Sequence, residues 1–245
     1  MSKRLNRSSS KEQADSPLSS HGLDGLGDVR RQTAHQLVRE QLRLAILRGS
    51  LAPGTPLVLS DLSDQLGTSR TPIREAIRDL ATEGLVDFDA FRSPVVHTPT
   101  LVEAREIYDL RLVLEPMGVK TAMDQLTDEH LDRAQAFHDE MLAASDVGEW
   151  VELNRQFHAI FTSVVRSSRL RAVMASLRDA AAAQVAQSIW ASRERMSSGN
   201  EEHKRILEAY RARDAELAAR ETQVHLLTTL KTVEEYYEGR LSSRT

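Results

Sequence analysis

The sequence predicts a mainly α-helical protein, in which an N-terminal winged helix-turn-helix domain precedes an all-helical bundle. Residues 59–83 have the pattern of two short amphipathic helices joined by a turn at Gly67, which is the helix-turn-helix plan. Two short stretches of alternating apolar residues follow at 85–88 and 95–97, as expected for a small two-stranded wing. From residue 101 onward, apolar residues keep helical spacing and glycine is scarce.

The predicted DNA-binding domain covers residues 29–99 and contains three helices and the wing. Before it, residues 1–28 are rich in serine, glycine and charge, so we expect a disordered tail. Apolar residues repeat every three or four positions between 33 and 48, which predicts the first helix, and Gly49 ends it. The recognition helix is expected to begin near Ser69 and to end at Gly84, with Ile73, Ala76, Ile77 and Leu80 buried.

The predicted C-terminal domain covers residues 100–240 and contains about six helices, near 101–124, 128–144, 148–165, 169–196, 200–212 and 214–239. Thr127, Asp146 and Asp214 are the expected N-caps of three of them. Ser198, Gly199 and Asn200 indicate the start of the helix at 200. Pro116 is expected to kink the first helix.

Composition predicts a cytoplasmic protein, and its local charge distribution is consistent with specific rather than bulk binding of nucleic acid. The chain has 245 residues and no cysteine, which excludes disulfides and thiolate metal sites. No apolar core follows the basic residues at the start of the sequence, so we expect no secretory signal, and no apolar run approaches the roughly 20 residues that a membrane helix needs. The net charge is −4, yet residues 29–100 carry nine Lys/Arg against eight Asp/Glu, whereas residues 101–245 carry nineteen against twenty-four. The charge that binds DNA is therefore confined to one helix face.

The start of the recognition helix carries the residues expected to read DNA. Arg70 and Arg74 are four residues apart and project from one side of the helix end that enters the major groove. An arginine fork matches the O6 and N7 acceptors of guanine, and each such contact contributes ~1–3 kcal/mol of discrimination. Ser69 and Thr71 can cap the helix or donate to phosphate.

The other arginines of this domain are weaker candidates for contacts with DNA. Arg78 lies one turn further along the recognition helix and is expected to meet the DNA backbone or to pair with Asp79 or Glu75. Arg92 in the wing is a candidate DNA contact, but an exposed surface position is an equal alternative. The same two alternatives stay open for Arg39 and Arg43 in the first helix.

The helical domain contains three histidines that could hold a metal ion. Asn154 and His158 share one face of a predicted helix, and that face is otherwise apolar. His203 and His225 lie on or beside apolar stripes of later helices, so the side chains could meet in the centre of a bundle around a divalent ion. The alternative for each histidine is a hydrogen-bonded core residue. His138 lacks an oxygen donor four residues earlier, and we interpret it as structural or exposed.

Residues 41–49, 69–78 and 83–86 together resemble the N-terminal domain of GntR-family bacterial transcription regulators. The helical half resembles the FCD ligand-binding domain of the FadR-type branch, so the resemblance covers about residues 30–240. It implies that Arg70 and Arg74 contact operator DNA, that the protein binds a palindrome as a homodimer, and that it is a repressor. The wing tip at 91–94 lacks the glycine usual in relatives, which departs from the family pattern.

The resemblance also favours a metal-binding role for the histidines. It implies the ligand set Asn154, His158, His203 and His225, with zinc as the first choice and nickel or manganese as alternatives. It further places Arg111 near an effector pocket, with a salt bridge to Glu115 as the alternative role of Arg111. An arginine fork suits a carboxylate, so we expect a small organic acid held between the metal and Arg111, with Glu115 as an orienting neighbour.

From the sequence we expect a regulator rather than an enzyme. It would be a transcriptional repressor that binds double-stranded operator DNA, and a carboxylate metabolite would release it from the DNA or modulate its binding. Two alternatives remain. Three histidines around an ion with an open position could activate water, as in a metal-dependent hydrolase, although no nucleophile and base can be singled out. Alternatively, the metal is purely structural and the organic acid binds elsewhere or not at all.

Overall fold

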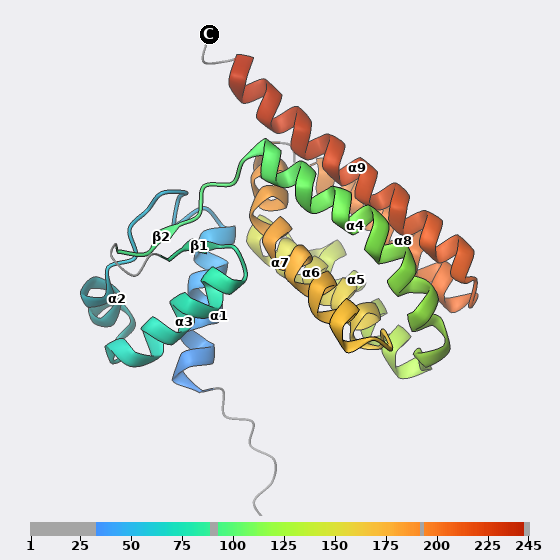
Figure 1. Ribbon diagram of the computed structural model, residues 1–245, viewed down its shortest axis with the longest axis horizontal. Coiled ribbons are helices and arrows are strands. Elements are labelled where there is room, and N and C mark those ends of the chain that lie inside the picture. Colours follow the sequence, from blue (N-terminus) through green and yellow to red (C-terminus); the bar gives the residue numbers. More distant parts are fainter. Residues whose placement is uncertain (1–32, 89–92, 192–193, 243–245) are drawn as a thin grey trace, which may run out of the picture. The chain divides into compact units, whose positions relative to one another are not determined.

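The computed structural model describes residues 33–88, 93–191 and 194–242, and it confirms the mainly helical fold with an N-terminal winged helix-turn-helix (Figure 1). The expected tail at 1–28 and the wing residue Arg92 lie outside the described residues. The elements of the N-terminal part are α1 (Ala34–Leu47), α2 (Leu59–Leu66), α3 (Arg70–Thr82), β1 (Val86–Asp87) and β2 (Val95–Val96).

Local signals in the sequence explain these first three helices. The Thr33 hydroxyl accepts a hydrogen bond from the backbone N–H of Gln36, and the Gln36 side chain accepts one from Thr33, so a capping box starts α1. Gly67 ends α2 with a φ of +61°, a left-handed conformation that favours glycine and makes the tight turn into α3. The expected apolar face of α3 is buried, as predicted: Ile73, Ala76, Ile77 and Leu80.

The wing is a short antiparallel pair of strands. Val86 pairs with Val96 and Asp87 pairs with Val95. His97 follows the second strand, and its Nδ1 and Nε2 lie 2.7 Å from Asp87 Oδ1 and 2.9 Å from Glu103 Oε2. Burial lowers the pKa of His97, but the hydrogen bonds that the ring donates to Glu103 and Asp87 outweigh this effect, so the net shift of the pKa is upward. His97 thus links the wing to the first turn of the next helix.

The described residues after 100 contain six helices, and the sequence predicted about six: α4 (Leu101–Ala122), α5 (Asp128–Ala143), α6 (Val147–Ser163), α7 (Ser168–Ala191), α8 (Glu194–Arg211) and α9 (Ala215–Ser242). A short 3₁₀ turn, Met123–Gln125, follows α4, and Pro116 lies inside α4. The predicted caps are confirmed: Thr127, Asp146 and Asp214 each accept a hydrogen bond from a backbone N–H three residues later. Among the described residues, no helix is both long and apolar enough to cross a membrane.

The predicted start of α8 at residue 200 was wrong. The helix begins at Glu194, and Ser198, Gly199 and Asn200 lie inside it. Tertiary packing explains these residue types: a Cβ on Gly199 would lie 3.1 Å from the Trp150 ring, and the Trp150 indole N–H donates to Asn200 Oδ1 over 2.9 Å. The small and polar residues therefore fit Trp150 of α6 rather than cap a helix.

Candidate functional site

The N-terminal end of α3 is exposed and presents all the residues of this helix that we expect to contact DNA. Ser69, Arg70, Thr71, Arg74 and Arg78 all have exposed side chains. Ser69 occupies the N-cap position, but its side chain makes no capping hydrogen bond. Within the described part of the chain, neither Arg70 nor Arg74 forms an ion pair. A helix N-terminus with free N–H groups and two uncommitted guanidinium groups is suited to bind an anionic backbone and base edges.

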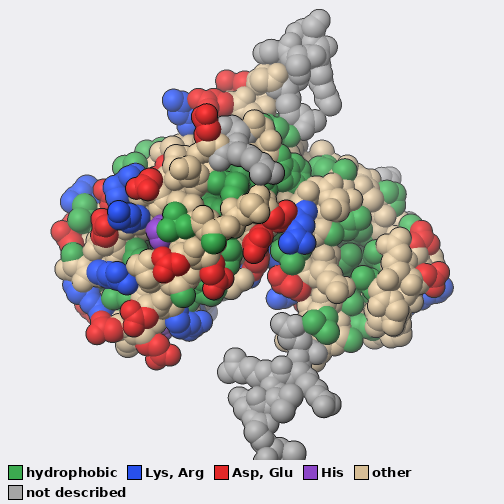
Figure 2. Space-filling view, turned by 180° about the vertical axis from the view of Figure 1, so that it is seen from behind, with side chains coloured by type: hydrophobic (Ala, Val, Ile, Leu, Met, Phe, Trp, Pro, Cys, Tyr) green, Lys and Arg blue, Asp and Glu red, His purple; other side chains and the backbone are tan. Residues whose placement is uncertain are grey.

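Of the two alternatives for Arg78, the ion pair with Asp79 or Glu75 is absent within the described ranges, and contact with the DNA backbone stays a prediction. The Arg78 guanidinium lies 5.9 Å from the centre of the Phe88 ring, next to the wing. Asp79 is instead 2.8 Å from His35 Nε2 on α1. Figure 2 shows acidic and basic side chains interspersed on one face of the molecule, in keeping with a local rather than a general basic surface.

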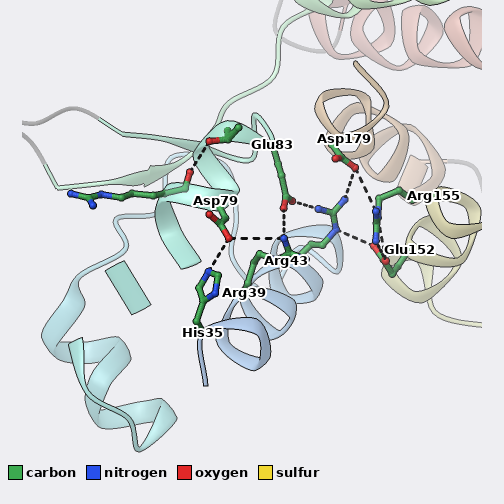
Figure 3. Close-up of polar contacts among 10 residues, drawn as sticks. His35, Arg39, Arg43, Asp79, Glu83, Glu152, Arg155 and Asp179 are labelled. Carbon is green, nitrogen blue, oxygen red and sulfur yellow. Dashed lines mark hydrogen bonds and ion pairs between the residues drawn. The ribbon is translucent and has the colours of Figure 1, made fainter. Parts of the chain in front are cut away.

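Arg43 is neither a surface residue nor a DNA contact, which decides the two alternatives left open by the sequence. Its side chain is only 3% exposed and forms ion pairs with Glu83, with Glu152 (Nε to Oε2, 3.0 Å) and with Asp179 (Nη2 to Oδ1, 3.5 Å) (Figure 3). Glu83 caps the C-terminus of α3, whereas Glu152 and Asp179 come from α6 and α7. One guanidinium therefore joins the DNA-binding elements to the bundle.

Arg39 and Arg155 extend the ion pairs of Arg43 into a network with the same three carboxylates, Glu83, Glu152 and Asp179. Arg39 lies 3.5 Å from Glu83, and Arg155 pairs with both Glu152 and Asp179. Burial raises the pKa of Glu83, and the neighbouring arginines only partly offset it. At Glu152 burial also favours the protonated acid, but the hydrogen bonds and charge of Arg155 and the charge of Arg43 outweigh it and lower the pKa.

His158, His203 and His225 meet in the centre of the bundle, from α6, α8 and α9. The candidate ligand nitrogens lie within 4.8 Å of one another, and all three side chains are buried. His138 is not part of this cluster. It is buried on α5, and its Nε2 lies 3.0 Å from the Asn200 carbonyl, which agrees with a structural role.

The cluster fits a divalent ion because several of its polar atoms lack other partners among the described residues. Asn154 Oδ1, His158 Nε2 and both ring nitrogens of His203 are buried there without a hydrogen bond, which is costly in a closed protein interior. Burial and the neighbouring histidines hold the pKa values of His158 and His203 well below the usual value, so both rings are neutral at pH 7 and can donate a lone pair. Asn154 lies one helical turn before His158 and could supply an oxygen.

The third histidine is held in place by a carboxylate. His225 Nδ1 lies 2.7 Å from Glu202 Oε2, so Nε2 is the ring nitrogen of His225 that remains available for a metal ion. Glu202 in turn accepts two hydrogen bonds from Arg195, at 3.0 and 2.8 Å. A carboxylate behind a histidine fixes the tautomer and orientation of a metal ligand. Sequence reasoning missed Glu202 and Arg195 in this role, although Glu202 directly precedes His203.

Arg111 forms the salt bridge to Glu115 that the sequence offered as its alternative role, and its role toward an effector stays a prediction. Its Nε donates to Glu115 Oε1 over 2.7 Å, so the salt bridge is present and fully buried. The same arginine lines a cavity together with Asn154 and His225, while Glu115 lines a neighbouring cavity with His158.

Arg178 of α7 lines both cavities, and the sequence did not single it out. One feature of the sequence could have identified Arg178: it is a charged residue on the otherwise apolar, buried side of a helix, between Met174 and Ala181.

Two family models match separate parts of the chain. Residues 34–90 match the model of the bacterial regulatory proteins of the gntR family, and residues 106–228 match the model of the FCD domain. One relative is the uncharacterized HTH-type transcriptional regulator YdhC of Bacillus subtilis, 29% identical over 143 residues. That alignment covers 57% of this chain and 64% of YdhC, so the chain spans less than two thirds of that protein.

Two further matches cover more of the chain. The probable D-xylose utilization operon transcriptional repressor of Paenarthrobacter nicotinovorans is 28% identical over 205 residues, which is 82% of this chain and 88% of that protein. The solved structure of McbR/YncC from E. coli superposes with a TM-score of 0.71 at 22% identity, covering 84% of this chain and 99% of that one. At that identity the superposition shows the fold alone. The relatives are named as transcription regulators and not as enzymes, which argues against a metal-dependent hydrolase.

Proposed function

Because the chain belongs to the GntR family of bacterial regulatory proteins and carries an FCD domain, we propose that it is a repressor whose operator binding responds to a carboxylate metabolite. The observation that carries the DNA-binding part is the exposed start of α3, where Arg70 and Arg74 form no ion pair with any described residue. In this proposal each guanidinium reads a base edge in the major groove, while Ser69 and Thr71 contact phosphate.

We propose that the repressor is a homodimer that binds a palindrome, since two-fold protein symmetry matches two-fold operator symmetry. An apolar stripe on α4 supports a second copy at this helix. Val102, Leu110, Val113 and Met117 follow one another at helical spacing, and each is 52–67% exposed. Exposed apolar side chains in a row on one helix are costly in water and are typical of a protein interface.

The proposed effector site is the cavity lined by Asn154, His225 and Arg111. Asn154, His158, His203 and His225 would hold the divalent ion, and the ion would supply a Lewis-acid anchor for one carboxylate. Glu202 orients His225, and Glu115 orients Arg111. The two DNA-binding domains of the dimer could adopt two relative positions. An effector that binds more tightly to one of these conformations shifts the population toward that conformation. If the favoured conformation does not match the spacing of the half-sites, the protein dissociates from DNA.

Selection from random DNA tests the proposed function directly. The purified full chain is mixed with a random-sequence duplex library, and the bound fraction is sequenced over several rounds. We expect enriched sites to be inverted repeats with half-site centres one or two helical turns apart, because a dimer places two recognition helices on one face of the duplex. Enrichment of a single half-site would contradict the homodimer, and no enrichment would contradict sequence-specific binding.

Removal of the metal is expected to lower the melting temperature and to abolish any effector-induced shift. A ligand that binds only the folded state stabilises it by ~2.7 kcal/mol at a concentration 100 times its dissociation constant. Melting of chelator-treated protein is compared with protein refilled with zinc, manganese or nickel. His203→Ala should lose the metal-dependent shift, whereas His138→Gln, a buried histidine outside the cluster, should keep it.

This pair of variants also separates the structural-metal alternative. If His203→Ala folds and still binds DNA but no longer responds to organic acids, the metal belongs to the effector site. If His203→Ala is unfolded even without chelator, the metal is structural, and the effector part of the proposal fails.

A further inference from the structure

The end of α1 is packed directly against the start of α6 and the end of α7. Gly148 lies in the first turn of α6, and a Cβ on it would lie 2.6 Å from Arg48 Cγ and 3.1 Å from the Arg48 backbone nitrogen. A Cβ on Gly49 would lie 2.8 Å from a ring carbon of Trp190 on α7. These approaches leave no room for a side chain at either glycine, so α1 and the bundle are in tight contact.

Ion pairs hold the same contact at two places. Arg48 Nε lies 2.8 Å from Oδ1 of Asp146, the N-cap residue of α6. Arg43 is buried, and its Nε lies 3.0 Å from Glu152 Oε2 on α6 while its Nη2 lies 3.5 Å from Asp179 Oδ1 on α7 (Figure 3). Separating a buried charge from its partners is strongly unfavourable, so these pairs oppose a movement of α1 away from the bundle. We call the contacts that Arg43, Arg48 and Gly49 make with α6 and α7 the junction.

A second, covalent attachment joins the DNA-binding elements to the bundle. Residues 97–100 connect β2 to α4, and the ring of His97 lies 2.7 Å from Asp87 of the wing and 2.9 Å from Glu103 of α4. A domain that is held only by such a connection can rotate about its backbone bonds, whereas a domain that is held at two separate places cannot. The junction therefore prevents the rotation that the connection would allow on its own.

In a dimer, the junction fixes where each recognition helix lies relative to its own bundle. In the proposed homodimer, the distance and angle between the two α3 helices are then set by the pairing of the bundles and by the junction of each copy. Each base pair inserted between two half-sites moves them apart by ~3.4 Å and rotates them by roughly 35°. A dimer with closed junctions cannot follow this change, so one spacing engages both recognition helices. Another spacing requires the bundles to repack or the junction to open.

We propose that the junction determines the half-site spacing of the operator, with Arg43, Arg48 and Gly148 as positioning residues that act through α3. This inference rests on the proposed homodimer and adds the residues that set its spacing specificity. In it, Arg70 and Arg74 read the bases of one half-site, and the junction decides how far away the second half-site lies.

Operators of altered spacing test this proposal on the purified full chain. Fluorescence anisotropy measures binding to the selected inverted repeat, to duplexes whose centre is shortened or lengthened by one or two base pairs, and to a duplex with a single half-site. For the wild type we expect a change of two base pairs to lower the affinity about 100-fold, because a second half-site that the dimer cannot reach contributes nothing.

Two variants loosen the junction in different ways. Glu152→Gln combined with Asp179→Asn removes its two bundle-side carboxylates, while Arg43 keeps Glu83 within the DNA-binding elements. In this variant the loss at a changed spacing should shrink to about 10-fold or less. Gly148→Ala places a Cβ between α6 and the end of α1, which should shift or broaden the preferred spacing. Both variants should bind the single half-site as the wild type does, since α3 is unchanged.

Matched controls place the same changes outside the junction. Gly239→Ala adds a Cβ on α9 with no atom of the described residues within 4 Å, and Glu140→Gln combined with Glu208→Gln neutralises two exposed carboxylates of the bundle. Both should keep the wild-type dependence on spacing. The inference is overturned if the two junction variants also keep it. It is equally overturned if they lose affinity for the single half-site as much as for every spacing, or if both are unfolded in a thermal melt, since the junction then has a structural role alone.

The wild type separates this inference from the proposed function. Equal affinity for every spacing would overturn the role of the junction and leave a homodimer on inverted repeats in place. If selection from random DNA yields no inverted repeat, the proposed homodimer fails, and the inference fails with it.

Discussion

Replacing Arg70 and Arg74 together by alanine is expected to abolish specific operator binding in a protein that still folds. Each bidentate contact to guanine contributes ~1–3 kcal/mol, so removing both guanidinium groups weakens binding by about 2–6 kcal/mol per half-site. Both side chains are exposed, and their helix is anchored by Ile73 and Ile77 on the opposite, fully buried face. Exposed substitutions of this kind change the free energy of unfolding by roughly 0.5 kcal/mol or less.

Fluorescence anisotropy with the selected operator and with a scrambled duplex measures both affinity and sequence preference. The matched control is Arg133→Ala with Arg169→Ala, which removes the same charge from exposed positions of the bundle. The control should bind the operator as the wild type does. If the Arg70 and Arg74 double variant retained wild-type affinity and preference, α3 would not be the recognition helix and the proposed function would fall.

Replacing Arg43 by methionine should cause the largest loss of stability of any single substitution considered. Removing one partner of a buried ion pair typically costs 3–5 kcal/mol, because the remaining charge stays buried without compensation. Here one guanidinium serves Glu83, Glu152 and Asp179, and Arg155 still compensates the last two. We therefore expect a loss of ~3–5 kcal/mol in urea unfolding, with Glu83 as the least compensated group, because it keeps only the partly exposed Arg39 at 3.5 Å.

The pH dependence of this loss identifies its cause. Burial already raises the pKa of Glu83 in the intact network, and loss of the Arg43 charge should raise it further. A carboxyl group with a raised folded pKa destabilises the protein above that pKa and ceases to do so once it is protonated. The difference between Arg43→Met and wild type should therefore be smaller at pH 5 than at pH 8.

Two variants complete this test. Glu83→Gln combined with Arg43→Met removes the uncompensated charge and should recover part of the lost stability. Arg43→Lys keeps the charge but loses the planar fork, so it should lie between wild type and methionine. A loss below about 1 kcal/mol for Arg43→Met, with no dependence on pH, would show that the network contributes little.

Much of the fold was predictable because its signals are local. The capping box at Thr33, the glycine turn at Gly67 and the cap at Thr127 depend on residues a few positions apart, and all three are present. The helix-turn-helix pattern also placed Arg70 and Arg74 on the exposed end of α3, since helical spacing alone sets which residues share a face. Helical spacing likewise indicated that His158 and His203 point inward.

The same reasoning could not predict contacts between segments that are far apart in the sequence. Gly199 resembles a helix breaker, yet it lies inside α8, where a Cβ would lie only 3.1 Å from the Trp150 ring. Arg43 could not be assigned from its own helix, since Glu152 and Asp179 lie 109 and 136 residues away in the chain. Arg178 looked like any helical arginine until the fold placed it beside buried histidines and, within the described ranges, out of ion-pair distance of every carboxylate.

The amino-acid sequence by itself determined the helix-turn-helix, the order of the helices and the side of α3 that faces outward. These features follow from hydrogen bonds and side-chain spacing within single segments. Only the tertiary structure decided which buried arginines form ion pairs with described residues: Arg43 pairs with three carboxylates and Arg195 pairs with Glu202, whereas Arg178 forms no ion pair. Pairing of buried charges depends on long-range proximity in a medium of low dielectric constant, and no local pattern encodes it.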